Sequence, residues 1–491
     1  MTKKLSTVWK MKKSKSKLKM LNVEKIKDPI ELLNNNNTNG NFDKYEELIY
    51  QTAEPDPEEI DLIIKGLKNF KAPGEDEINP ELLKLAGKDL KTELYLLIKD
   101  VWKNECMPKD WNLGIICPIF KKGDMKKVTN YRGISLLDTA YKVLSIAILR
   151  RLEMYAKDIF GEYQCGFKKG KSTTDHIHTL RQLMEKYYEY NKDLHILFVD
   201  FKQAYDNINR EQLWITLRNF GIPDKLVRLV QMCNEQTYYK VRFLGEVSTR
   251  FECKTGLKQG DTLSPVLFNL ALEKVVRNTT DTKEMDVIVT HTLLAYADDI
   301  IILRKSKHDI EERARKLINS SSNMGLVINE NKTKYMVMTG NATTKGNLHV
   351  GDLTFEQSST QGDEEKLQNF ERKILRKMYG PVYNNELDRF ERRKNENLQQ
   401  LYNKPSIRHL LIRKRLEFAG HVWQAEDTLI KKVTESKITG KRPRGKPRQR
   451  WYDRVEKDLK KINPLLDMGA ALDREKWKDI LEAAMVLNGP L

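Results

Sequence analysis

Three aspartates in this sequence stand directly beside short apolar runs. Asp298 and Asp299 lie between two such runs, each long enough for a strand and too short for a helix, so the pair is predicted at the tip of a hairpin. Asp200 ends another apolar run, about a hundred residues earlier. Two carboxylates held together at the end of buried strands are costly in free energy unless a cation binds there. The spacing therefore predicts a divalent metal site. A solvated turn is the alternative for the Asp-Asp pair taken alone.

Carboxylates from two neighbouring strands are typical of a two-metal site for phosphoryl transfer, as in a polymerase palm. One ion would lower the pKa of an attacking hydroxyl, and the other would neutralise charge on a departing pyrophosphate. Hard oxygen ligands and phosphate-rich substrates favour Mg²⁺, with Mn²⁺ as an alternative.

Composition indicates a nucleic acid partner. The 491 residues carry a formal net charge of +18, and the pI is about 9.3, a balance typical of proteins that bind polyanions. No apolar run approaches the roughly 20 residues that a membrane span needs, and the N-terminus lacks the apolar core of a signal peptide. The five cysteines are scattered without metal-ligand or disulfide spacing. These features predict an intracellular protein of the nucleus and cytoplasm, without a membrane partner.

Shifts in composition divide the chain into five predicted segments. They are a basic disordered tail (1–40), an N-terminal helical segment (41–112), a central α+β region (113–340), a junction (341–365) and a basic helical C-terminal region (366–491). Within the last, the proline-containing segment 441–451 is strongly basic and is interpreted either as a phosphate-backbone contact or as a solvated linker.

Several local patterns predict helix boundaries and faces. Ser172 and Asp175 have the spacing of a capping box, and Ser264 is predicted as an N-cap before Pro265. Asp206 is interpreted as a helix cap in preference to a metal ligand, and His421, without metal-spaced partners, as structural. The helix after Asp175 is expected to bury the apolar residues at helical spacing, which are Ile177, Leu180, Leu183, Met184 and Tyr187. The glycine- and lysine-rich loop before it is either a phosphate grip or a plain surface loop.

Three motifs in one order make the family recognisable. They are FVDFKQAYD (198–206), the QG pair (259–260) followed by LSP (263–265), and YADD (296–299). Upstream, KAPG (71–74) and YRGISLL (131–137) match the leading and finger segments. Over about residues 60–340 the chain resembles a reverse transcriptase of non-LTR (LINE-like) retrotransposons. The resemblance implies an α+β fold with polymerase palm and fingers, an antiparallel sheet packed by helices.

The resemblance also implies roles for individual residues. The metal ligands would be Asp200, Asp298 and Asp299. Tyr205 would be the steric gate that disfavours a ribose 2′-hydroxyl. Contacts to the nucleotide and the template base would come from Gln259 and Gly260. Arg132, with Lys121 or Lys122, would clamp the triphosphate, and Lys332 would donate a proton to pyrophosphate. Ordinary surface charge is the alternative for Arg132 and Lys332.

The resemblance further implies an RNA template, a DNA primer or target and dNTPs as partners, with no indication of oligomeric state. Two departures from the family are expected. Only about sixty residues precede the match, so an endonuclease domain is expected to be absent. No primer-grip hairpin or thumb pattern follows the palm, which indicates an internal deletion near residues 356–360. Two alternatives to an active reverse transcriptase therefore stay open: a copy that binds RNA or DNA without polymerising, and an RNA-dependent RNA polymerase, which Tyr205 disfavours.

Overall fold

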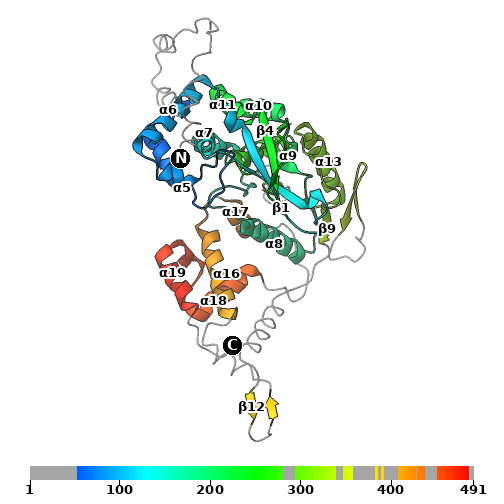
Figure 1. The fold of residues 1–491 in the computed structure, drawn as a ribbon. Coiled ribbons are helices and arrows are strands. Elements are labelled where there is room, and N and C mark those ends of the chain that lie inside the picture. The colour runs from blue at the N-terminus through cyan, green and yellow to red at the C-terminus, as the bar shows by residue number, and fades with distance from the viewer. Residues whose placement is uncertain are drawn as a thin grey trace, which may run out of the picture. The chain divides into compact units, whose positions relative to one another are not determined.

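Figure 1 shows the fold of the chain in a computed structural model, and the described residues fall into two compact units. The structure describes residues 52–279, 293–338, 347–357, 382–384, 389–391, 407–426, 428–436 and 450–485. Unit 1 comprises Met1–Gly161, Lys202–Val275 and Ser321–Val327, and unit 2 comprises Glu162–Phe201, Val276–Ser320 and Ile328–Leu491. The predicted tail (1–40), most of the predicted deletion point (356–360) and most of the basic segment 441–451 lie outside the described residues.

Helices make up about half of unit 1, and some of them begin with a side-chain cap. Asp56 accepts a hydrogen bond from Glu59 N (2.7 Å), and Asn79 accepts one from Leu82 N (3.1 Å), each just before a proline at the first helical position. The helical elements are α4 (Pro57–Gly66), α5 (Pro80–Lys84), α6 (Lys88–Asn104), η2 (Lys109–Asn112), η3 (Val128–Asn130), α7 (Thr139–Ile159), α9 (Ala204–Asn207), α10 (Arg210–Asn219), α11 (Asp224–Asn234) and α12 (Ser264–Arg277), whose last residues enter unit 2.

One cap prediction in this unit is wrong. Ser264 is the first residue of α12, and its buried hydroxyl has no hydrogen-bond partner among the described residues. The helix instead begins its backbone ladder one residue earlier, with Leu267 N donating to Leu263 O (3.1 Å).

The sheet of unit 1 has the order β2-β1-β4-β5, and β6 also pairs with β4. Its strands are β1 (Leu113–Phe120), β2 (Tyr131–Leu136), β4 (Thr237–Phe243), β5 (Glu246–Val247) and β6 (Phe251–Cys253). β1 pairs antiparallel with β2 and parallel with β4. The sheet is therefore mixed, with a parallel pair beside the expected antiparallel ones, and the long connection between β1 and β4 permits that parallel pair.

The core of unit 1 lies around α7, whose residues Leu144, Ile148 and Leu152 are fully buried. Arg151 is also buried, and its guanidinium binds both carboxylate oxygens of Glu59 from α4 (3.0 and 3.1 Å). Because the cation is paired and hydrogen-bonded, its burial is tolerated, and it ties the N-terminal helices to the centre of the unit.

Unit 2 is built on a six-stranded sheet of order β10-β11-β9-β3-β8-β7. The strands of this unit are β3 (Leu194–Val199), β7 (Leu293–Tyr296), β8 (Asp299–Arg304), β9 (Lys334–Met338), β10 (Leu348–Val350), β11 (Leu353–Gln357) and a separate pair, β12 (Val382–Asn384) and β13 (Arg389–Glu391). Its helical elements are α8 (Thr173–Glu189), α13 (Lys307–Asn323), α16 (Ile407–Gln424), α17 (Leu429–Glu435), α18 (Trp451–Ile462), η4 (Met468–Leu472) and α19 (Arg474–Ala483), with the end of α13 in unit 1. β9 and β11 are parallel, so this sheet is mixed as well.

Helix α8 begins with the predicted capping box of Ser172 and Asp175. The predicted apolar face is only partly correct, because Leu183 and Tyr187 are buried against the sheet whereas Ile177 is 65% exposed. His178 is buried instead, since α8 is covered on a second, polar side by C-terminal helices. The helix therefore has two buried faces, which a single apolar stripe cannot indicate.

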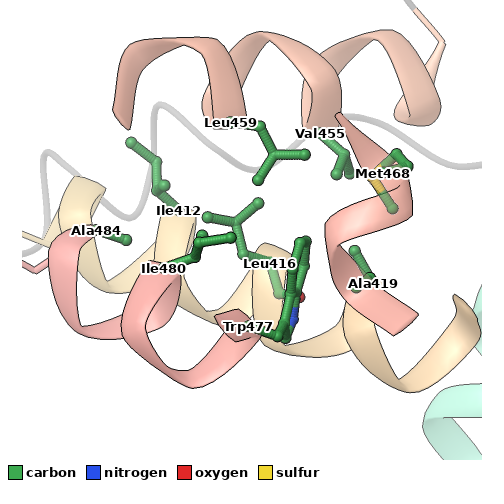
Figure 2. Close-up of a cluster of buried hydrophobic side chains, with 10 residues drawn as sticks. Ile412, Leu416, Ala419, Val455, Leu459, Met468, Trp477, Ile480 and Ala484 are labelled. Atoms are coloured by element: carbon green, nitrogen blue, oxygen red, sulfur yellow. The ribbon is translucent and has the colours of Figure 1, made fainter. Parts of the chain in front are cut away.

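The C-terminal helices form a core of their own, shown in Figure 2, in which Trp477 packs with Leu416 and Leu459. Trp477 also donates from its indole nitrogen to Leu416 O (3.1 Å). Within the described part of the chain, every helix is too short or too polar to cross a lipid bilayer.

Polar contacts dock these helices on α8. Arg450 binds the carboxylate of Glu189 (2.7 Å), and Lys186 donates to Thr434 O (3.0 Å). His421 Nε2 lies 2.9 Å from Asp175 Oδ1. Burial raises the pKa of Asp175, but the hydrogen bonds from the His421 side chain and the Ser172 backbone, together with the nearby positive charge of His421 and Lys171, outweigh burial and lower that pKa. Asp175 in turn raises the pKa of His421.

Candidate active site

Asp298 and Asp299 lie at the tip of the predicted hairpin. β7 and β8 pair antiparallel, and the last pair of the ladder is Tyr296 with Asp299. Ala297 and Asp298 are thus the two turn residues, and Ala297 has a positive φ of 54°, as a two-residue hairpin turn requires at its first position. The hairpin brings the second aspartate to the start of a strand whose following residues are mostly buried.

Asp200 directly follows β3, which pairs with β8 so that Val199 lies opposite Ile300. The residue is held from both sides of its backbone, because its N–H donates to Thr333 Oγ1 (3.2 Å) and its carbonyl accepts from Asn329 N (2.7 Å). The paired strands therefore place Asp200 at the same edge of the sheet as the Asp-Asp turn.

The charges at this edge act on one another. Partial burial raises the pKa of the Asp299 carboxyl, the carboxylates of Asp298 and Asp200 raise it further, and Lys332 lowers it. Lys332 Nζ lies 3.5 Å from Asp200 Oδ1, a buried oxygen without a hydrogen-bond partner among the described residues. The structure thus brings together all four residues that the sequence predicts for catalysis, and negative charge dominates there.

Charge and donor chemistry at this edge suit a divalent cation. The donors are hard carboxylate oxygens, one of them buried and without a hydrogen bond, and mutual repulsion would be relieved by a bound ion. Among the described residues, however, no three His, Cys, Asp or Glu side chains are arranged to hold one ion as they stand. The assignment of Asp200, Asp298 and Asp299 as metal ligands therefore stays a prediction.

The predicted nucleotide-binding residues belong to unit 1. The ring of Tyr205 stacks on Phe268, with centroids 4.5 Å apart and planes at 11°, so its orientation is fixed by the core of α12. Gly260 has a φ of +121°, and a Cβ there would lie 2.6 Å from Ser135 O, so only glycine fits this close approach to β2. Ser135 N in turn donates to Gln259 O (2.6 Å).

Asp206 is not a helix cap. It lies inside the short helix α9, and its Oδ1 accepts a hydrogen bond from Gln259 Nε2 (2.8 Å). Sequence reasoning missed this bond because the two residues are 53 positions apart. The bond fixes the amide of Gln259 relative to α9, which also carries Tyr205.

The three predicted phosphate-clamping cations lie on the β1–β2 hairpin. Arg132 is exposed on β2 opposite Ile119 of β1, and Lys121 and Lys122 are exposed just after β1. None of the three forms a salt bridge within the described residues. Lys121 lies close enough to Asp206 to lower its pKa, although burial of that carboxyl outweighs this and raises it. Arg132 and the two lysines are therefore solvent-facing cations on one hairpin, as a triphosphate clamp needs.

Two groups of supporting residues were not found from the sequence. Beneath the Gln259–Gly260 loop, Lys258 is buried with its Nζ over the ring of Tyr141 (4.5 Å), and Tyr141 donates to Asp261 Oδ2 (2.6 Å). Beside the Asp-Asp turn, Gln164 is buried and binds the turn directly. Lys258 and Gln164 contact residues that are far from them in the chain, so no local pattern indicates their roles. Only their positions next to recognised motifs could have drawn attention to them.

The description of the family model that matches this chain is "Reverse transcriptase (RNA-dependent DNA polymerase)", and the match covers residues 119–392, more than half of the 491 residues. The chain belongs to the reverse transcriptase family. Its fold is accordingly the α+β fold of a reverse transcriptase domain, and the Asp200 and Asp298–Asp299 edge lies within the matched residues.

Relatives of this chain include proteins of non-LTR elements from Drosophila melanogaster. The chain is 26% identical over 311 residues to the "Probable RNA-directed DNA polymerase from transposon X-element", which covers 62% of this chain and 34% of the relative. It is 29% identical over 257 residues to the "RNA-directed DNA polymerase from mobile element jockey", and this match covers 51% of this chain and 27% of the relative. It is 24% identical over 277 residues to the "Retrovirus-related Pol polyprotein from type-2 retrotransposable element R2DM", and this match covers 56% of this chain and 26% of the relative. The chain spans about a third or less of the length of these relatives.

Among solved structures, a telomerase from Candida albicans in complex with a fragment of telomeric RNA shows 14% identity and a TM-score of 0.40, with 82% of this chain and 69% of that chain covered. An apo telomerase from Candida tropicalis has a TM-score of 0.39 at 17% identity, with 50% and 54% covered. Likeness at this level adds nothing to the assignment.

Proposed function

We propose that this chain is the RNA-directed DNA polymerase of a non-LTR retrotransposon and extends a primer 3′-hydroxyl with dNTPs on an RNA template. The observation that carries the proposal is the placement of Asp200, Asp298 and Asp299 at one edge of the unit 2 sheet, where their charges repel one another, in a chain of the reverse transcriptase family.

The predicted site residues would have separate roles in this reaction. Asp200, Asp298 and Asp299 would hold Mg²⁺ or Mn²⁺, which when bound supplies charge neutralisation and activation of the 3′-hydroxyl. Lys332, already beside Asp200, would protonate the pyrophosphate. In unit 1, Tyr205 would exclude a ribose 2′-hydroxyl, Gln259 and Gly260 would lie against the nucleotide and template base, and Arg132 with Lys121 or Lys122 would bind the triphosphate.

The partners and location follow from the same proposal. RNA template and DNA primer or target are polyanions, for which the formal net charge of +18 provides attraction that weakens with salt. A retrotransposon enzyme of this kind would act on its RNA in the cytoplasm and on DNA in the nucleus.

A second candidate is a retrotransposon remnant that binds RNA or DNA without polymerising. It is favoured by one observation, that no three acidic or other ligand side chains in the described residues are arranged to hold an ion as they stand. An RNA-dependent RNA polymerase is disfavoured by the fixed ring of Tyr205.

Primer extension on poly(rA)/oligo(dT) with Mg²⁺ and dTTP tests the proposal. Asp298→Asn removes one predicted ligand and should abolish extension. Asp309→Asn is the matched control, because Asp309 is an exposed aspartate on α13 and its loss changes net charge equally. Extension by the wild type and Asp309→Asn but not by Asp298→Asn is expected. Duplex binding without extension in all three proteins would contradict the polymerase and support the remnant.

A further inference from the structure

Gln164 joins two segments of unit 2 that are far apart in the chain. Its side chain is 2% exposed, and its Oε1 accepts two hydrogen bonds, one from Gly166 N (2.8 Å) and one from Ala297 N (3.1 Å). Ala297 is the first residue of the two-residue turn that carries Asp298. A single buried oxygen therefore binds the turn from outside the hairpin.

The backbone around Gln164 extends this attachment. Ala295 N donates to Tyr163 O (2.9 Å), and Cys165 N donates to Ala295 O (2.9 Å), so the segment lies beside β7 like an extra short strand. At Gly166, a Cβ would collide with the backbone of Tyr296 and Ala297, so the two backbones are in direct contact there. The segment thus fixes both the end of β7 and the turn that follows it.

The turn needs such support because its geometry is not the one its residues prefer. Ala297 has a φ of +54°, a left-handed conformation that is strained for a residue with a Cβ. The mutual repulsion of Asp200, Asp298 and Asp299 also favours movement of the turn away from Asp200. A hydrogen bond to Ala297 N opposes both tendencies.

We propose that Gln164 is the positioning residue of the Asp298–Asp299 turn and holds the two carboxylates in place for a divalent cation. The inference rests on the proposed function, because it assumes that the carboxylates bind metal. Residues that orient ligands without touching the ion typically change metal affinity by about 10–100-fold when they are replaced.

Mn²⁺ binding, measured by electron paramagnetic resonance on the full chain without nucleic acid, tests this role. Gln164→Met keeps the size of the side chain and removes the strong acceptor, so Mn²⁺ should bind at least tenfold more weakly. Gln164→Glu retains oxygens that accept both N–H groups and should bind Mn²⁺ within about threefold of wild type. Gln182→Met is the matched control, because Gln182 is also 2% exposed and lies on α8, and it should bind like wild type.

Any one of four results would overturn the inference. Gln164→Met could bind Mn²⁺ like the Gln182→Met control, or Gln164→Glu could be as weak as Gln164→Met, which would show that the acceptor oxygen is irrelevant. If the wild type binds no Mn²⁺, both the proposed function and this inference are overturned. If Asp298→Asn binds Mn²⁺ more weakly while the Gln164 variants bind it like wild type, only the inference is overturned.

A second measurement holds even where Gln164→Met fails to fold. In the wild type, the amide of Ala297 should exchange slowly with deuterium, because it is bonded to a buried oxygen, whereas the amide of an unsupported turn residue exchanges quickly. Fast exchange at Ala297 in an otherwise protected hairpin would refute the positioning role.

Discussion

Asp138 gives the sharpest test of the electrostatics of unit 1. Burial and, after it, the nearby carboxylate of Asp76 raise the pKa of its carboxyl from 3.8 to about 7. The two residues meet where the 71–76 turn contacts the start of α7, and Asp76 N lies 3.4 Å from Asp138 Oδ1. Asp138→Asn would remove the titration and keep an oxygen in place to accept that bond.

The sign of the effect follows from the direction of the shift. The folded state keeps the Asp138 proton up to about pH 7, while the unfolded chain loses it near 3.8, so this contribution to stability is full below about pH 4 and is lost as pH rises to about 7. At about 1.4 kcal/mol per pKa unit, the loss has a ceiling of about 4 kcal/mol. Because Asp76 shares the titration, the measured value should lie below that ceiling.

Thermal unfolding from pH 4.5 to 8.5 measures this contribution. Relative to wild type, Asp138→Asn should be more stable at pH 8, with a midpoint higher by up to about 10 °C, and the difference should shrink toward pH 4.5. Asp110→Asn, which replaces an exposed aspartate of the same unit, should show no such trend. A pH-independent difference between Asp138→Asn and wild type would refute the buried-carboxyl argument.

Two further predictions concern the docked helices and the nucleotide. His421→Asn should lower the midpoint of unit 2 more at pH 5.5 than at pH 8, since the raised pKa of His421 means that its stabilisation is full below about 6.5 and fades as pH rises through the folded value. The loss should stay below about 1 kcal/mol because the imidazole is 42% exposed, and an equal loss at both pH values would contradict the ion pair with Asp175. Tyr205→Ala should raise the ratio of rUTP to dTTP incorporation on poly(rA)/oligo(dT), because the ring fixed on Phe268 is then gone; an unchanged ratio would remove Tyr205 from the gate.

Local patterns in the sequence predicted the features that depend on residues a few positions apart. The Asp-Asp hairpin and the capping box at Ser172 depend on short apolar runs and on side chains within one turn of their targets. The placement of Asp200 near Asp298 was predicted as well, because strand ends that carry carboxylates in this order match the motifs of a known family.

Tertiary contacts decided what local patterns could not. Ile177 is exposed and His178 buried because C-terminal helices more than 200 residues later cover α8. Asp206 binds Gln259 instead of capping a helix, since both are brought together by the path of the chain. Hydrogen bonds between distant residues, and the burial of one segment by another, depend on the path of the chain. The periodicity of residues within one segment does not reveal that path.

The Asp-Asp turn shows most clearly which features follow from the sequence and which follow from the tertiary structure. The sequence determined that two carboxylates stand at a hairpin tip, because apolar runs on both sides of Asp298 and Asp299 can only be buried as strands. Only the folded chain decided that the oxygen of Gln164, 133 positions before Ala297, holds that tip. A hydrogen bond has no signature in the order of residues when its donor and acceptor meet through the packing of whole elements.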